Sequence, residues 1–209
     1  AAGVAHRERG EGKEASEEFY QAALADPTNE KVVMEVVQFL LVSRQKDKLF
    51  QLLIKATKDP EAPANLHALM AATYLERKKM DLAKMAAEKA IRKGPKLIVG
   101  YKSLIQIYRQ EAKNGGKRTE QIRKTLDRAM AQTDVPAPYQ VELALMLLGY
   151  LELDKQAAGE LKPKISKLLD EAWAGKPKQP LLLENLARAY RGNGTHDKAA
   201  AVMESLLKL

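Results

Sequence analysis

Few side chains in this sequence have a type and spacing that could perform chemistry. The three histidines, His6, His67 and His196, are too far apart in the sequence to share one helix face as metal ligands. The chain has no cysteine, which excludes disulfides, thiolate metal sites and cysteine nucleophiles. Gly115 and Gly116 lack the spacing of a phosphate-binding loop. We therefore predict no catalytic residue, no metal site and no cofactor, and we do not expect an enzyme.

The composition indicates that the remaining side chains are carried on helices. Of the 209 residues, 45% are hydrophobic and 30% are charged, and between the thinly spread glycines and prolines the chain is rich in Ala, Leu, Lys, Glu and Gln. Residues 31–43 are rich in valine, which favours strands, but the length of this segment and its neighbours favour a buried helix. The sequence predicts an all-α fold.

No segment predicts insertion into a membrane. The longest apolar run, residues 143–151, is shorter than the roughly 18 to 20 residues that a bilayer span needs, and no signal segment opens the sequence. The absence of cysteine is compatible with either redox compartment. We expect a soluble protein of unknown compartment, with the cytoplasm favoured over the cell envelope or secretion.

One pattern recurs about every 34 residues along the chain. Each copy has small or apolar residues, an aromatic residue shortly after them, an alanine nine residues further on, and then a proline. Tyr74 is followed by Ala83, and Tyr190 is followed by Ala199, at the same spacing of nine. In the first copy, His6 takes the aromatic position. The clearest copy consists of Met70, Ala71, Tyr74, Ala83, Ala87, Ala90 and Pro95.

This pattern resembles the tetratricopeptide repeat (TPR), a helix–turn–helix unit with Trp-x2-Leu-Gly-x2-Tyr, Ala-x3-Phe, and then Ala and Pro. The resemblance covers nearly the whole chain. It implies a right-handed α-solenoid of about six TPR-like repeats in a single superhelical domain over residues 1–209, with the first repeat truncated. Insertions at residues 114–119 and around 154–162 depart from the regular period. The approximate repeats are 1–29, 30–62, 63–97, 98–136, 137–178 and 179–209.

Both ends of the predicted repeat array are unusual. The first repeat lacks the residues that would precede Ala2 and Gly3, so we expect the chain to be part of a longer protein. At the other end, Leu206, Leu207 and Leu209 leave an apolar face without a following polar helix. We expect further repeats or self-association to cover this face.

The resemblance also implies a binding surface. In TPR proteins, the first helices of successive repeats line a surface that binds extended or helical peptides, so the resemblance implies a scaffold for protein–protein interaction. The carboxylate clamp of some family members is not matched, and Lys102 with Gln106 comes nearest to it. The positions that the resemblance assigns to partner binding are Met34, Gln38, Asn65, Ala68, Leu69, Ala72, Lys102, Gln106 and Arg109.

The positive charge of the chain is concentrated in one window. The chain has 35 Lys and Arg and 27 Asp and Glu, for a net charge of +8, whereas residues 89–128, the basic window, hold twelve basic and three acidic residues, a local charge of +9. We therefore expect a protein or peptide partner with an acidic segment. Two alternatives stay open, a helical-repeat protein that binds RNA or another polyanion, and an assembly domain of a larger protein. Against RNA, Tyr101 is the one residue of the window suited to stack on a base.

Overall fold

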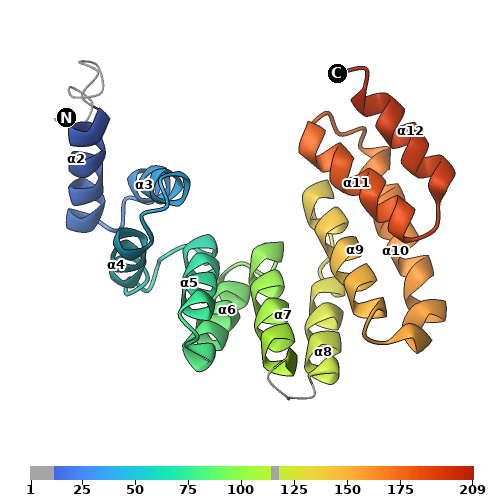
Figure 1. Cartoon of the computed structure of the whole chain (residues 1–209), viewed down its shortest axis with the longest axis horizontal. Coiled ribbons are helices and arrows are strands. Elements are labelled where there is room, and N and C mark those ends of the chain that lie inside the picture. The colour runs from blue at the N-terminus through green and yellow to red at the C-terminus, as the bar shows by residue number, and fades with distance from the viewer. Residues whose placement is uncertain (1–11, 114–117) are drawn as a thin grey trace. The chain divides into compact units, whose positions relative to one another are not determined.

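The structure is a computed structural model that describes residues 12–113 and 118–209, with side chains from residue 16 onward. In these ranges the chain forms eleven α-helices and one short 3-10 helix, with no strand (Figure 1). The predicted all-α fold is confirmed. Residues Ala2, Gly3 and His6 of the first predicted copy lie outside the described residues. The chain divides into two compact units, residues 1–94 and 95–209. Whether one superhelical domain unites them, with the repeat boundaries given above, stays a prediction.

The described part of the first unit, residues 12–94, contains five helices. The valine-rich segment forms α3, which confirms its interpretation as a helix, and Asn29 caps it by accepting a hydrogen bond from the Val32 N–H at 3.3 Å. Helices α5 and α6 lie side by side, because Ala71, Ala83 and Ala87 are fully buried and their small side chains let the two backbones come close. The helices are α2 (Gly12–Ala25), α3 (Glu30–Val42), α4 (Lys46–Ala56), α5 (Ala64–Glu76) and α6 (Met80–Lys93).

The second unit continues the alternation of helices. The expected insertion around residues 154–162 is largely helical: a 3-10 turn, η1, leads directly into a long α10 that contains Pro163. Of the other insertion, residues 114–117 lie outside the described residues. The helices are α7 (Ile98–Lys113), α8 (Thr119–Met130), α9 (Ala137–Leu151), η1 (Lys155–Ala157), α10 (Ala158–Ala174), α11 (Pro180–Gly192) and α12 (His196–Leu206).

The residues that carry the repeat pattern form the core of both units. A fully buried leucine or valine contributes roughly 1.5 to 3 kcal/mol to stability, so this shared core accounts for much of what holds the helix pairs together. Tyr74 is only half-buried, and Met203 of the last copy is exposed on α12. The buried pattern residues include Val33, Val36, Val37, Leu40, Leu49, Leu53, Ala56, Met70, Ala90, Tyr101, Leu104, Ile105, Ile122, Leu126, Ala129, Tyr139, Ile165, Leu169, Ala172, Leu183, Leu186, Ala187, Tyr190 and Ala199.

Three helix pairs are joined by the same tight turn. Arg44, Lys78 and Gly194 each lie between a first and a second helix, and each has a positive φ, of 57°, 59° and 86° respectively. In each case the next N–H reaches back to the carbonyl five residues earlier, as Lys79 does to Tyr74 at 2.9 Å. The backbone geometry of the turn therefore recurs even where the residue is not glycine.

Buried tyrosines link neighbouring helices of the second unit. The Tyr139 hydroxyl, on α9, donates to the Ala129 carbonyl near the end of α8 at 2.9 Å, and its ring packs edge-on against Tyr101 of α7. Burial raises the pKa of Tyr139, so the hydroxyl keeps its proton and remains a donor. The Ala129 carbonyl also accepts from the Gln132 N–H at 3.2 Å, so the tyrosine adds a second hydrogen bond at the end of α8.

Candidate functional site

Several cations of the basic window that belong to the second unit are paired with acids outside the window. Lys96 approaches Asp134 at 3.5 Å, Lys102 pairs with Glu142 at 2.8 Å, and Arg123 pairs with Glu160 at 2.7 Å. Inside the window, Arg118 pairs with Glu111 and Lys124 with Glu120, each at 2.7 Å. The local charge of +9 therefore overstates the positive charge that the second unit offers to a partner.

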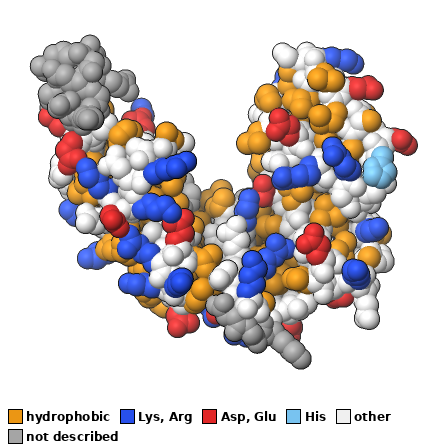
Figure 2. All heavy atoms as spheres, viewed as in Figure 1, with side chains coloured by type: hydrophobic (Ala, Val, Ile, Leu, Met, Phe, Trp, Pro, Cys, Tyr) orange, Lys and Arg blue, Asp and Glu red, His pale blue; other side chains and the backbone are white. Residues whose placement is uncertain are grey.

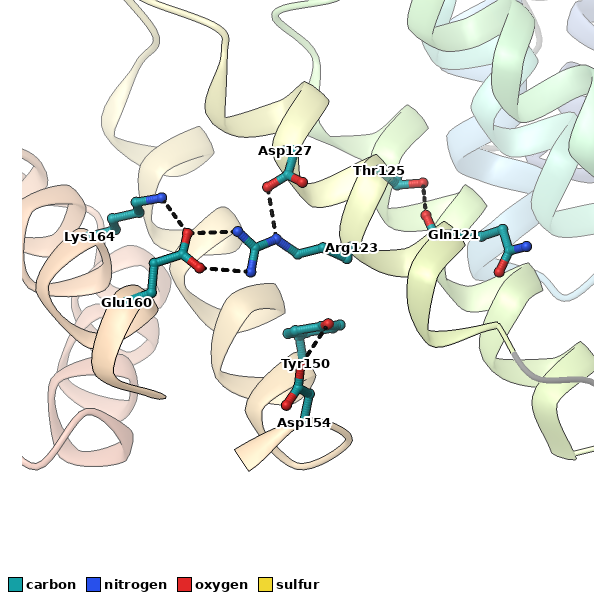
Figure 3. Close-up of polar contacts among 8 residues, drawn as sticks. All are labelled: Gln121, Arg123, Thr125, Asp127, Tyr150, Asp154, Glu160 and Lys164. Atoms are coloured by element: carbon teal, nitrogen blue, oxygen red, sulfur yellow. Dashed lines mark hydrogen bonds and ion pairs between the residues drawn. The ribbon is translucent and has the colours of Figure 1, made fainter. Parts of the chain in front are cut away.

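The Arg123 pair is a structural link between α8 and α10 (Figure 3). Its guanidinium donates to both oxygens of Glu160 and, through Nε, to Asp127 at 2.9 Å, while Lys164 also donates to Glu160. The hydrogen bond from Arg123, helped by that from Lys164, lowers the pKa of Glu160 to about 2. Every charged group of this cluster has an oppositely charged partner. The cluster therefore links α8 to α10 and presents little unpaired charge to a ligand.

The predicted binding residues of the first unit lie on α3 and α5. Asn65 donates to the Met34 sulfur at 3.6 Å, which joins the two helices at that point. Gln38 is exposed, Leu69 and Ala72 are half-buried, and Ala68 is buried. Ala68 can therefore add little to a contact surface. The role of these six positions in partner binding stays a prediction.

The last turn of α3 carries exposed apolar side chains. Phe39, Leu41 and Val42 are exposed, although Val33 and Leu40 of the same helix are buried. The last turn of α3 therefore leaves apolar surface exposed, which is the kind of surface that partner proteins contact.

The predicted residues of the second unit meet in one groove. Lys102, Gln106 and Arg109 project from α7 into a depression of about 220 Å³, which is also lined by Glu142 of α9 and Arg188 of α11. The floor is apolar and consists of Ile105, Leu145 and Met146. On the face of the second unit seen in Figure 2, basic side chains likewise lie beside hydrophobic ones. We call this depression, with its eight lining residues, the α7/α9/α11 groove.

Arg109 has an unusual setting in the α7/α9/α11 groove. Its Nε is buried and has no hydrogen-bond partner among the described residues. Its guanidinium lies against Gly149 of α9, where a Cβ would be only 2.5 Å from Nη2. Glycine at position 149 is therefore required for this placement of the arginine.

Sequence reasoning missed the α9 half of the groove, although the repeat contains the signal. Lys102 and Glu142 are 40 residues apart, and the same offset relates Ile105 to Leu145 and Arg109 to Gly149. The groove thus joins equivalent positions of two successive first helices. The insertion between α7 and α8 lengthens the period from about 34 to 40, which hid this correspondence.

The remaining candidate residues do not form a site. His67 is buried in α5 and His196 is exposed at the start of α12, while His6 lies outside the described residues. Among the described residues no group of three potential ligands could hold a metal ion, and no described helix has the length and hydrophobicity to cross a membrane. Leu207 and Leu209 are exposed at the end of α12, and self-association through this face stays a prediction.

Comparison with solved structures identifies the fold. The chain is similar to a thermophilic TPR protein of Thermus thermophilus, at 22% identity and a TM-score of 0.56, over 86% of this chain and 90% of the other. It is also similar to a tetratricopeptide repeat protein of Parabacteroides merdae, at 12% identity and a TM-score of 0.55, over 99% of this chain and 77% of the other. No family model and no curated protein matches the sequence. The chain therefore has the fold of TPR proteins, as its repeat pattern predicts.

Proposed function

We propose that this chain is a protein-interaction scaffold that binds a peptide or helical segment of a partner in the α7/α9/α11 groove. The observation that supports this most directly is the lining of the groove, where three cations and one carboxylate surround an apolar floor. Such a combination suits a segment that carries both acidic and apolar side chains. Met34, Gln38, Asn65, Leu69 and Ala72 would form a second contact surface on the first unit.

Selection of peptides from a random display library, with the whole chain as bait, tests this proposal. The selected peptides are expected to bind at least tenfold more weakly to the double variant Lys102→Glu/Arg109→Glu, because it places a second carboxylate beside Glu142 and reverses the charge at position 109. The matched control is Lys155→Glu/Lys162→Glu, which makes the same change of net charge at exposed positions outside the groove. Circular dichroism should show equal helicity for all three proteins. Equal peptide affinity of the two double variants would refute the placement.

The nucleic-acid alternative is tested with the same proteins and a labelled oligouridine. No aromatic side chain lines the groove, so bases would find no stacking partner there. We expect only weak binding that falls steeply with salt, since it would depend on phosphate contacts alone. Tight oligouridine binding at physiological salt, together with failure to select any peptide, would favour the alternative.

A further inference from the structure

We propose that Arg109, seated on Gly149, is the residue that recognises an acidic side chain of the bound peptide, and that an apolar side chain next to that acid lies on the groove floor. This inference rests on the proposed function, because it names the chemistry of the segment that the α7/α9/α11 groove would accept.

Of the three cations that line the groove, only Lys102 has an acidic partner among the described residues. Lys102 is matched by Glu142 at 2.8 Å, and Arg188 donates to the neutral Asn185 side chain at 2.9 Å. Arg109 makes no hydrogen bond or ion pair with a described residue. The groove therefore carries two positive charges without a carboxylate. A guanidinium held in a partly buried place gains most from an anionic partner with two acceptor oxygens.

The Arg109 side chain is also held in place. The missing side chain of Gly149 lets the guanidinium lie close to the backbone of α9, and Nε is buried, although the Arg109 side chain still lines the groove. Because little side-chain freedom remains to be lost on binding, a carboxylate would bind there at a lower entropic cost than at a freely moving surface arginine.

The size and lining of the groove also limit what can bind there. A volume of about 220 Å³ suits one or two side chains, and the apolar floor of Ile105, Leu145 and Met146 lies beside the cations. Peptides carry carboxylates and apolar groups on adjacent residues without any modification. The occupant that fits both features is a peptide with Asp or Glu next to a Leu, Ile, Val or Met.

The test uses the peptides selected on the wild-type chain and, for each, a synthetic analogue in which the acidic residue is replaced by its amide. We expect the library to be enriched in an acid next to an apolar residue, and we expect each amide analogue to bind about tenfold more weakly than its parent. In the variant Arg109→Gln the parent and analogue should bind equally. Arg109→Lys should keep only part of the affinity difference between parent and analogue, because an ammonium lacks the planar fork of donors.

A second variant separates recognition from folding. Gly149→Ala should displace the guanidinium and reduce the preference for the acidic peptide as Arg109→Gln does, while thermal unfolding shows a fold at least as stable, because alanine favours a helix over glycine. Selected peptides without an acidic residue, with the same affinity for wild type and Arg109→Gln, would overturn this inference and leave the proposed function standing. If no peptide binds in the groove, the proposed function fails and this inference fails with it. A phosphoserine analogue that binds more tightly than the carboxylate peptide would also overturn it.

Discussion

His67 shows how burial can set the charge of a residue. It lies near the start of α5 with 2% of its surface exposed, and its Nε2 has no hydrogen-bond partner among the described residues. Burial, with a smaller contribution from the positive charges of Lys89 and Lys93, lowers the pKa of His67 to about 4. The side chain is therefore neutral in the folded chain at physiological pH and acts as a part of the core.

This setting predicts a pH-dependent stability. An unfolded histidine has a pKa of about 6.5, so between about pH 6.5 and 4 the unfolded chain binds more protons than the folded one. The free energy of unfolding should then fall by roughly 3 kcal/mol from this residue alone as the pH drops from about 7 to 4. Urea unfolding of wild type and His67→Leu across this range measures the effect, and the variant should lose less stability. Two parallel curves would show that His67 is protonated as readily in the folded chain.

Sequence reasoning at the scale of residues succeeded for the core and failed for the contacts of the groove. Val36, Leu53 and Ile165 could be predicted as buried because the repeat fixes which side of each helix meets its partner. The contact between Arg109 and Gly149 could not be predicted, because it depends on which residue of α9 lies opposite Arg109 of α7. The insertion between α7 and α8 had changed that register.

At the scale of elements, the turns between paired helices carry an unfavourable backbone conformation. Lys78 adopts a φ of 59° where the equivalent turn between α11 and α12 has Gly194. A side chain in the left-handed region costs about 1 to 2 kcal/mol, and glycine avoids that cost.

We therefore expect Lys78→Gly to stabilise the chain by up to about 1 kcal/mol, because part of the relief is offset by the greater freedom of glycine in the unfolded chain. Thermal unfolding should show a higher midpoint for Lys78→Gly and a lower one for Gly194→Lys, which makes the opposite exchange in an equivalent turn. A lower midpoint for both variants would mean that the lysine side chain makes a contact worth more than its backbone cost.

Ion pairs between neighbouring helix pairs follow the repeat period. Lys48 pairs with Glu17 at a separation of 31 residues, Arg123 with Glu160 at 37, and Lys102 with Glu142 at 40. Charges one repeat apart are thus brought together by stacking. Composition alone indicated a strongly basic window, since a local charge count cannot include partners that lie a full repeat away.

At the scale of the whole molecule, the division into two compact units predicts that a destabilising core substitution affects mainly the unit that contains it. Stability in a stacked repeat protein is approximately a sum of terms within units and between nearest neighbours. Leu126 is fully buried in the second unit, and Leu126→Ala should cost about 2 to 5 kcal/mol there. Amide hydrogen exchange followed by mass spectrometry should show a larger loss of protection over residues 118–209 than over residues 30–93. An equal loss in both units would indicate one cooperative block.

Pro163 weakens the backbone hydrogen bonding at the start of α10. Proline has no N–H, so the Gly159 carbonyl lacks its usual helical partner, and the opening turn of α10 depends on side chains for part of its support. Glu160, in that same turn, accepts hydrogen bonds from Arg123 and Lys164. Dissolved ions weaken the attraction between partly exposed charges. Concentrated salt should therefore let the first turn of α10 fray while the rest of the helix remains folded, so that the order of this turn depends on ionic strength.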